Sequence, residues 1–389
     1  MNIDFHYYAT YCAAYLAGYT AAEAADIAYS AQFVDCCTDT FLYAIQGPAF
    51  AATTQTNIEL ASLSSTKINR QNITRIWSSF HFLPYDLEAE LPKHTKKYLN
   101  KYRLICGPNG ALLKDTVDLV KNTSLQAVGM AMHILADTWA HSNFAGTPSL
   151  VINNINFHFY ELLSQDDGSL TERPIRFTHN PGAPDNLEES IYLNTMFQTS
   201  EYSIMNLGHG RAGHLPDYSF IRYKYLPAWG KYEELIKDNP SDYWNAFCQL
   251  VYALKTLKDP SAEFELNKYE EEACEPYKEE IQKILNTRQI SSVEDWKQFG
   301  AKLTGQALED FDVKKYAAEY MMAVREEKPN TFLGRFFVAA MAQKNMVTRK
   351  IYESGSTLAG ISLKINGSDI QTIDDFIGLL GMNRKGGSE

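Results

Sequence analysis

Cysteine is scarce in this sequence: six of the 389 residues are cysteines, and none forms a C-x-x-C pair. Small secreted proteins rely on disulfides because they cannot bury enough apolar surface, whereas 45% of this chain is hydrophobic. The small number of cysteines therefore argues against a disulfide framework. It predicts reduced thiols, as in a cytoplasmic protein.

Long apolar runs are also missing. No stretch of 18 or more apolar residues occurs, so no transmembrane helix is predicted. The first residues, MNIDFHYYATYCAAYLAGY, contain no basic n-region and no uninterrupted apolar h-region, both of which a normal signal peptide needs. We therefore expect a cytoplasmic location, with secretion by a non-classical route left open.

Basic residues are outnumbered: 36 Lys and Arg residues stand against 47 Asp and Glu residues, which makes the net charge −11. Non-specific binding to nucleic acid needs a basic surface. We therefore expect no stable nucleic-acid complex. A cluster of metal ions would reverse the sign of the charge locally, so an anionic substrate is not excluded.

The chain is patterned mainly for helices. Residues 4–17 predict a first helix, with Gly18 just past its end. Thr20 and Glu23 form a capping box for a second helix, which is expected to continue to just before Gly47. A helical N-terminal region is therefore predicted.

Later segments add further helices and one long loop. A short helix is expected to end at Pro84, and another to begin with Asn122, Thr123 or Ser124 as its cap. Residues 147–220 are rich in Pro and Gly and predict a long irregular segment, which is often functional. Helical patterns return after this segment.

These patterns predict an all-α fold, a multi-helix bundle with long loops. We expect one large helical domain over residues 1–380. Its metal-binding half is expected over about 1–225 and its helical C-terminal half over about 226–380. Residues 381–389 are predicted to be a disordered tail.

The segment GMAMHILADTWAHSNFAG places His133, Asp137 and His141 at steps of four residues in an otherwise apolar helix. A step of four turns a helix by about 40° and rises about 6 Å, so the two histidines share one stripe about 12 Å apart. One ion can hardly bind all three side chains. A carboxylate can bridge two ions, so the spacing favours several zinc ions with Asp137 between them. The alternative interpretation is a polar seam on a solvated face.

Three ligands are too few for such a cluster, so other segments must contribute. The candidates lie in apolar or glycine-rich surroundings: His6 in DFHYY, Asp35 in QFVD, His81 in FHFLP, and His209, His214 and Asp217 in LGHGRAGHLPDYSF. For Asp35 and His81 the alternative is a buried polar pair satisfied by tyrosine hydroxyls.

The order of these residues resembles that in the zinc-dependent phospholipases C and in the single-strand-specific zinc nucleases, which share an all-helical fold. In that superfamily the central motif continues to a further His followed shortly by Asn-Phe, and HILADTWAHSNF is similar. This resemblance covers about residues 1–220. The whole chain also resembles an uncharacterised bacterial family with the blocks DFHYY, QFVD, HF-P, H-x-x-x-D-x-x-x-H and GH…PD.

The resemblance implies a role for each candidate. His133 and Asp137 match the first His and the bridging Asp of the superfamily motif. His141 matches the second His, although the gap is two residues shorter than in the phospholipases. Asp35 and His81 match the Asp and His that complete the first metal.

The resemblance also implies a ligand on the first helix, which His6 matches, but it shows two departures. The characterised enzymes use a mature N-terminal Trp as a ligand, where this chain begins MNI. Their final H-x-x-x-E/D motif is absent, and we expect His209, His214 and Asp217 to replace it.

These ligands predict a phosphoester hydrolase with two or three zinc ions, in which metal-bound hydroxide attacks a phosphodiester. Asp35 and Asp137 are the expected catalytic residues: Asp35 orients the attacking water or accepts its proton, and Asp137 bridges the ions. Analogy to the fold favours a lipid phosphodiester as substrate. The alternatives are a zinc nuclease, which would stack bases on aromatic side chains, and a non-enzymatic helical binding protein with one structural zinc.

Overall fold

The computed structural model describes residues 1–62, 67–155, 158–164, 168–180, 182–194, 206–231, 233–361, 372–375 and 377. The tail expected at 381–389 and the domain end expected at 380 lie outside these residues. Helices take up 53% of the structure and strands 8%. The prediction of an all-α fold is therefore wrong, because the molecule combines helices with two small sheets.

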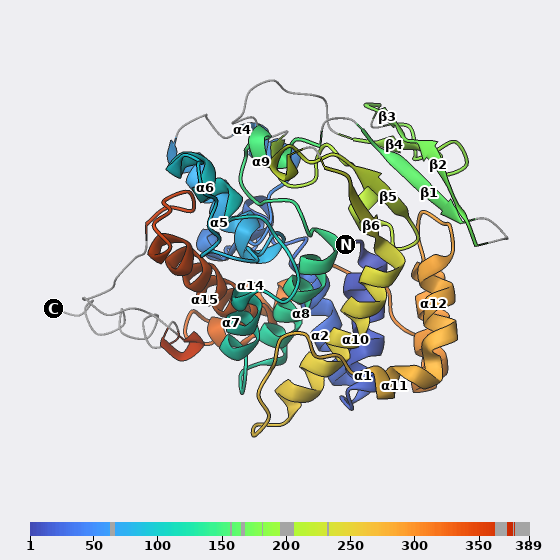
Figure 1. Ribbon diagram of the computed structural model, residues 1–389. Coiled ribbons are helices and arrows are strands. Elements are labelled where there is room, and N and C mark those ends of the chain that lie inside the picture. Colours follow the sequence, from blue (N-terminus) through green and yellow to red (C-terminus); the bar gives the residue numbers. More distant parts are fainter. Residues whose placement is uncertain are drawn as a thin grey trace.

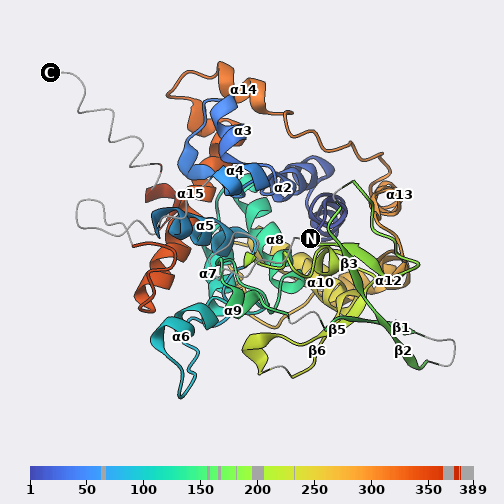
Figure 2. The same ribbon diagram turned by 90° about the horizontal axis from the view of Figure 1, so that it is seen from above.

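Helices fill most of the molecule, and the sheets lie on one side of it, away from α15 (Figure 1; Figure 2). The helical elements are η1 (Asp4–Ala9), α1 (Thr10–Leu16), α2 (Ala21–Phe33), α3 (Asp39–Ala44), η2 (Ala49–Ala51), α4 (Asn57–Ser62), α5 (Lys67–Phe80), α6 (Lys96–Tyr102), α7 (Ala111–Leu119), α8 (Leu125–Ala140), α9 (Leu150–Asn153), η4 (Leu215–Asp217), η5 (Ala228–Gly230), α10 (Asn239–Lys258), α11 (Glu271–Cys274), η6 (Glu275–Tyr277), α12 (Lys278–Asn286), α13 (Val293–Thr304), α14 (Ala317–Met322), η7 (Lys328–Asn330) and α15 (Phe332–Glu353).

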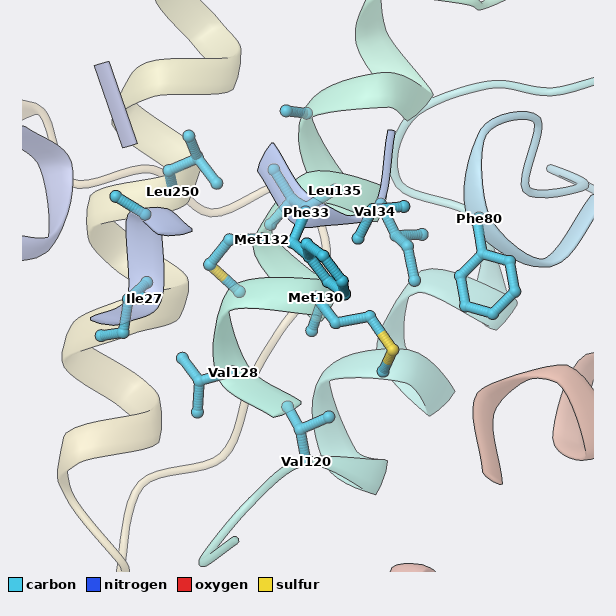
Figure 3. Packing of buried hydrophobic residues seen from close by; sticks show 14 of the residues in the cluster. Ile27, Phe33, Val34, Phe80, Val120, Val128, Met130, Met132, Leu135 and Leu250 are labelled. Atoms are coloured by element: carbon cyan, nitrogen blue, oxygen red, sulfur yellow. The ribbon is translucent and has the colours of Figure 1, made fainter. Parts of the chain in front are cut away.

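Helix α8 runs through the middle of the helical part, with α2, α10 and α15 packed around it. Ser124 caps its first turn by accepting a hydrogen bond from the Ala127 N–H, one of the three caps predicted. Gly129 allows a close approach to α2, because a Cβ there would lie 2.2 Å from the Ile27 carbonyl oxygen. Figure 3 shows part of the apolar cluster that α8 shares with α2 and α10. Elements of both predicted halves therefore build one core around α8.

The second helix is shorter than predicted. Helix α2 ends early, and α3 begins after Thr38, whose side chain caps the new helix. Thr53 lies against the break between these two helices. Its N–H donates a hydrogen bond to the Cys37 carbonyl, and its Oγ1–H donates one to the Val34 carbonyl. Asp35 therefore lies in a turn between two helices and not on a helix face.

The segment predicted to be irregular contains most of the strands. The strands are β1 (Tyr160–Ser164), β2 (Leu170–Pro174), β3 (Arg176–Thr178), β4 (Ile191–Leu193), β5 (Arg222–Tyr225) and β6 (Leu235–Asp238). Four of them form an antiparallel sheet in the order β2-β1-β5-β6, and β3 pairs with β4 in parallel. In this register Tyr160 of β1 lies opposite Pro174 of β2 and Lys224 of β5.

A second apolar cluster packs against the four-stranded sheet. Tyr223 and Tyr225 of β5 point to the same face, because alternate residues of a strand do so, and both are buried with Phe159. The same cluster contains Phe82 and Phe144, which lie just beyond the ends of α5 and α8. The sheet therefore stabilises the positions at which these two helices end.

Two predictions, free thiols from the few cysteines and no transmembrane helix from the missing apolar runs, agree with the structure. All six cysteines are free thiols, and five of them are buried. In the part of the chain that the structure describes, no helix has both the length and the apolar character to cross a membrane.

Candidate metal centre

The stripe predicted on α8 faces the protein interior. His133 and Asp137 are buried within α8, and His141 is the buried residue at its C-terminal end. Asp137 Oδ2 lies 3.1 Å from His133 Nε2 and 3.5 Å from His141 Nδ1. Because these side chains are buried, the interpretation as a solvated polar seam does not hold.

The first group of ligand atoms joins η1 to α8. His6 lies in η1, a π-helical segment, and such segments are frequent at functional sites. Its Nε2 lies 3.1 Å from Asp137 Oδ1, and its ring stacks on that of His133 with centroids 3.8 Å apart. His6, His133 and Asp137 each offer one ligand atom, and these atoms lie within 4.8 Å of one another.

The second group forms where the turn after α2 meets the end of α5. His81 Nδ1 lies 3.8 Å from Asp35 Oδ1 and 3.2 Å from Asp137 Oδ2, and His133 Nε2 lies 3.3 Å from the same nitrogen. Ligand atoms of Asp35, His81 and His133 again lie within 4.8 Å. His81 Nε2 faces the Thr53 carbonyl oxygen at 3.1 Å, and an N–H donated to a carbonyl leaves the other ring nitrogen free to bind metal.

The third group lies at the other end of the stripe and combines His141, His209 and Asp217. His141 Nε2 is 3.3 Å from Asp217 Oδ1, and His209 Nε2 is 3.9 Å from Asp217 Oδ2. The second ring nitrogen of each histidine faces a backbone carbonyl. His141 Nδ1 lies 2.8 Å from the His81 carbonyl oxygen, and His209 Nδ1 lies 3.1 Å from the Gly213 carbonyl oxygen. Gly213 has a φ of +59°, and a Cβ there would lie 2.0 Å from a backbone oxygen, so this turn requires glycine.

The three groups adjoin one another. His133 belongs to the first and the second group. Asp137 contacts a histidine from each group: His6 through Oδ1, and His81 and His141 through Oδ2. A carboxylate can bridge two ions through its two oxygens, and Asp137 presents Oδ1 to His6 of the first group and Oδ2 to His81 of the second.

The charges of the centre suit cations. Burial raises the pKa of a carboxyl group, but the nearby histidines and the amine of Met1 keep the pKa values of Asp137 and Asp217 well below the usual value. Burial lowers the pKa of His6 to about 3 and that of His209 to about 4. Metal binds the unprotonated imidazole, so the lowered pKa values of His6 and His209 favour the form that binds, and these buried His/Asp clusters could hold metal ions.

The amine of Met1 also lies in the centre, which sequence reasoning did not anticipate. Its nitrogen is 2.7 Å from Asp137 Oδ1, 3.4 Å from Asp217 Oδ1 and 3.5 Å from His141 Nε2. Burial alone would lower the pKa of this amine, but Asp137, Asp217 and Asp35 together raise it to about 11. Both views place the N-terminus beside α8 (Figure 1; Figure 2).

Eight of the nine predicted ligands lie in the three groups: His6, Asp35, His81, His133, Asp137, His141, His209 and Asp217. Among the described residues, His214 belongs to none of them. Its Nδ1 lies instead 2.9 Å from Oδ2 of Asp185. Sequence reasoning did not single out Asp185, because a lone Asp in a polar segment gives no signal.

Comparison with known protein families assigns the chain to a family. A family model described as "Family of unknown function (DUF6765)" matches residues 1–351. The chain belongs to this family. The matched residues include every member of the three ligand groups. No curated protein and no solved structure matches the chain.

Lys344 on α15 binds the segment that precedes Thr53, a residue that contacts the centre. Its buried Nζ donates hydrogen bonds to the carbonyl oxygens of Phe50 at 2.8 Å and Ala52 at 2.5 Å. The next residue is Thr53, whose carbonyl faces His81. Burial lowers the pKa of Lys344 to about 7.

We expect Lys344 to make the stability of the protein depend on pH. In the unfolded chain a lysine keeps its proton up to a pKa of about 10.4, whereas folded Lys344 releases it near pH 7. Between these values the unfolded chain binds more protons, so the free energy of unfolding increases with pH.

Urea unfolding at about pH 6.5 and about pH 9, with the same metal content in the wild-type and variant samples, measures this contribution. The free energy of unfolding of the wild type, minus that of Lys344→Met, should be larger at the higher pH. An equal difference at the two pH values would show that Lys344 keeps its proton in the fold.

Proposed function

We propose that the protein is a zinc-dependent phosphoester hydrolase with two or three zinc ions. The main support is the convergence of three adjoining ligand groups: His133 belongs to two of them, and Asp137 of the first group contacts a histidine of each. Structural zinc sites are usually closed by four protein ligands, whereas catalytic sites use three and keep a position for water. Each group here offers three ligand side chains, with His133 available to either the first or the second, and so few ligands per ion favour catalysis over a purely structural zinc.

In this proposal the metal ions, Asp137 and Asp35 have separate roles. Bound zinc would lower the pKa of a coordinated water and offset the negative charge of a phosphoryl group. Asp137 would be the ligand shared between ions, because its two oxygens face histidines of different groups. Asp35 is the most exposed member of the groups, with 33% of its side chain accessible, and Gln32 Nε2 donates to its Oδ2 at 3.3 Å. We assign Asp35 to orient the attacking water or accept its proton.

A lipid phosphodiester is the substrate class that we propose. The support is the order of the ligands, which resembles that of the zinc-dependent phospholipases C. The net charge of −11 does not oppose an anionic substrate, because cations would dominate the field in the centre. The same charge makes a nucleic-acid substrate the less favoured choice.

The test combines metal analysis with a substrate panel. Elemental analysis and anomalous scattering on protein never exposed to chelator should show two or three zinc ions per chain at the three groups. The panel consists of bis(p-nitrophenyl) phosphate, phosphatidylcholine vesicles and single-stranded DNA, and the first two should be hydrolysed. A single zinc per chain and no hydrolysis of any phosphate ester would instead support a binding protein with a structural zinc.

A further inference from the structure

Beside the ligand groups, Asp185 and His214 form a pair with its own hydrogen-bond network. The Asp185 carboxylate is 2% exposed and accepts three hydrogen bonds. The donors are the Leu193 N–H at 2.6 Å, the Tyr218 hydroxyl at 2.7 Å and His214 Nδ1 at 2.9 Å. An anionic acceptor with this many donors holds the proton of His214 on Nδ1 and fixes the plane of the ring.

The other side of the His214 ring is open. The side chain is 47% exposed although Nδ1 is bound to a buried carboxylate, so the ring points its far edge outward. Within the described residues, His214 Nε2 has no hydrogen-bond partner. An imidazole held through Nδ1 by a carboxylate, with Nε2 free, is the arrangement that enzymes use for proton transfer.

The position of the pair links it to the metal centre. His214 directly precedes η4, which contains Asp217 of the third ligand group. A 3₁₀-helix rises about 2 Å per residue, so the backbones of His214 and Asp217 lie about 6 Å apart. On the other side of His214, the carbonyl of Gly213 faces Nδ1 of His209, a second member of that group, at 3.1 Å. The backbone of this loop therefore carries His214 beside the third group.

A purely structural role accounts poorly for this pair. The Tyr218 hydroxyl and the Leu193 N–H already connect Asp185 to the neighbouring segments. The hydrogen bond from His214 to Asp185 raises the pKa of His214, and the negative charges of Asp185 and Asp217 act in the same direction. Tyr218, whose ring contacts that of His214, is the other titratable neighbour. These interactions therefore favour the imidazolium form of His214.

We propose that His214 is a catalytic residue that donates the Nε2 proton to the leaving oxygen of the phosphoester, and that Asp185 positions it. This inference rests on the proposed hydrolase function. The oxygen of the attacking water forms the new bond to phosphorus, and the bond between phosphorus and the leaving oxygen breaks. The proton from His214 Nε2 moves to that oxygen, which departs as an alcohol. The neutral imidazole then regains a proton from solvent.

The test compares two substrates that differ in leaving group. A p-nitrophenolate leaves without protonation, whereas the alkoxide released from phosphatidylcholine needs a proton. His214→Gln should lower kcat for the alkoxide substrate by about 100-fold or more and change kcat for bis(p-nitrophenyl) phosphate by less than about 3-fold. Asp185→Asn should give the same selectivity with a smaller loss. His94→Gln, an exposed histidine on the lysine-rich segment, serves as the matched control and should change neither rate.

Four outcomes would overturn the inference. Equal losses on both substrates would indicate a structural role. Fewer zinc ions per chain in His214→Gln would indicate a metal ligand. If the wild type hydrolyses neither substrate, the proposed hydrolase function itself fails, and the role of His214 fails with it. If His214→Gln does not fold, the test is made on the wild type by measuring how kcat depends on the pKa of the leaving group. A shallow dependence supports a proton donor, and a steep dependence contradicts it.

Discussion

Replacing Asp137 by Asn should remove at least one metal ion per chain and abolish phosphodiester hydrolysis, while most of the helical fold is retained. Asp137 contacts His6 through Oδ1 and His133, His81 and His141 through Oδ2, so each oxygen faces a different part of the centre. An asparagine keeps the shape but has no negative charge and only one oxygen. Zinc per chain, circular dichroism and the rate on bis(p-nitrophenyl) phosphate measure the three effects.

The control for this substitution is Asp118→Asn, at an exposed carboxylate that pairs with Lys114 on the protein surface. It should leave metal content and rate unchanged. The informative comparison is His141→Ala, which should spare the first two groups because His141 belongs only to the third. If His141→Ala removed all metal while Asp137→Asn removed none, the bridging assignment of Asp137 would be wrong.

Removing the metal should lower the melting temperature markedly. The ligands come from η1, the turn after α2, the end of α5, helix α8 and the loop before β5, so bound ions would cross-link segments that are far apart in sequence. An ion present at 1,000 times its dissociation constant adds about 4 kcal/mol to the free energy of unfolding. For two or three ions we expect a loss on the order of 10 °C or more.

Differential scanning calorimetry before and after chelation tests this expectation, with verification of metal removal by elemental analysis. The same chelator preloaded with zinc is the control for effects of the chelator itself. Readdition of zinc should restore the melting temperature. An unchanged melting curve in metal-free protein would mean that any ion binds at the periphery and not between the core elements.

The stripe on α8 could be predicted from the sequence because the helical period alone determines it. Residues at steps of four share a face of any helix, and the apolar neighbours of His133 and Asp137 require that helix to be buried. Burial of an aspartate among apolar residues then demands partners. Histidines and aspartates in similar apolar or glycine-rich settings, such as His6 and His81, were therefore reasonable candidates for those partners.

The sheet could not be predicted in the same way. Its strands are only four or five residues long, and β2, with the sequence LTERP, is almost fully exposed. Such a segment becomes a strand through its pairing with a partner, and β1 pairs with both β2 and the distant β5. Local propensity carries little of this information, which is why the sequence of residues 147–220 predicts an irregular segment.

The sequence by itself determined which kinds of ligand are present and that those on α8 share one stripe, because a helix converts spacing directly into direction. Only the tertiary structure decided which remote side chains reach that stripe. His214 and Asp217 lie three residues apart in one glycine-rich loop, yet Asp217 turns to His141 and His209 while His214 turns to Asp185. The direction of each side chain there depends on η4 and on a carboxylate 29 residues away, and loops have no period from which such directions follow.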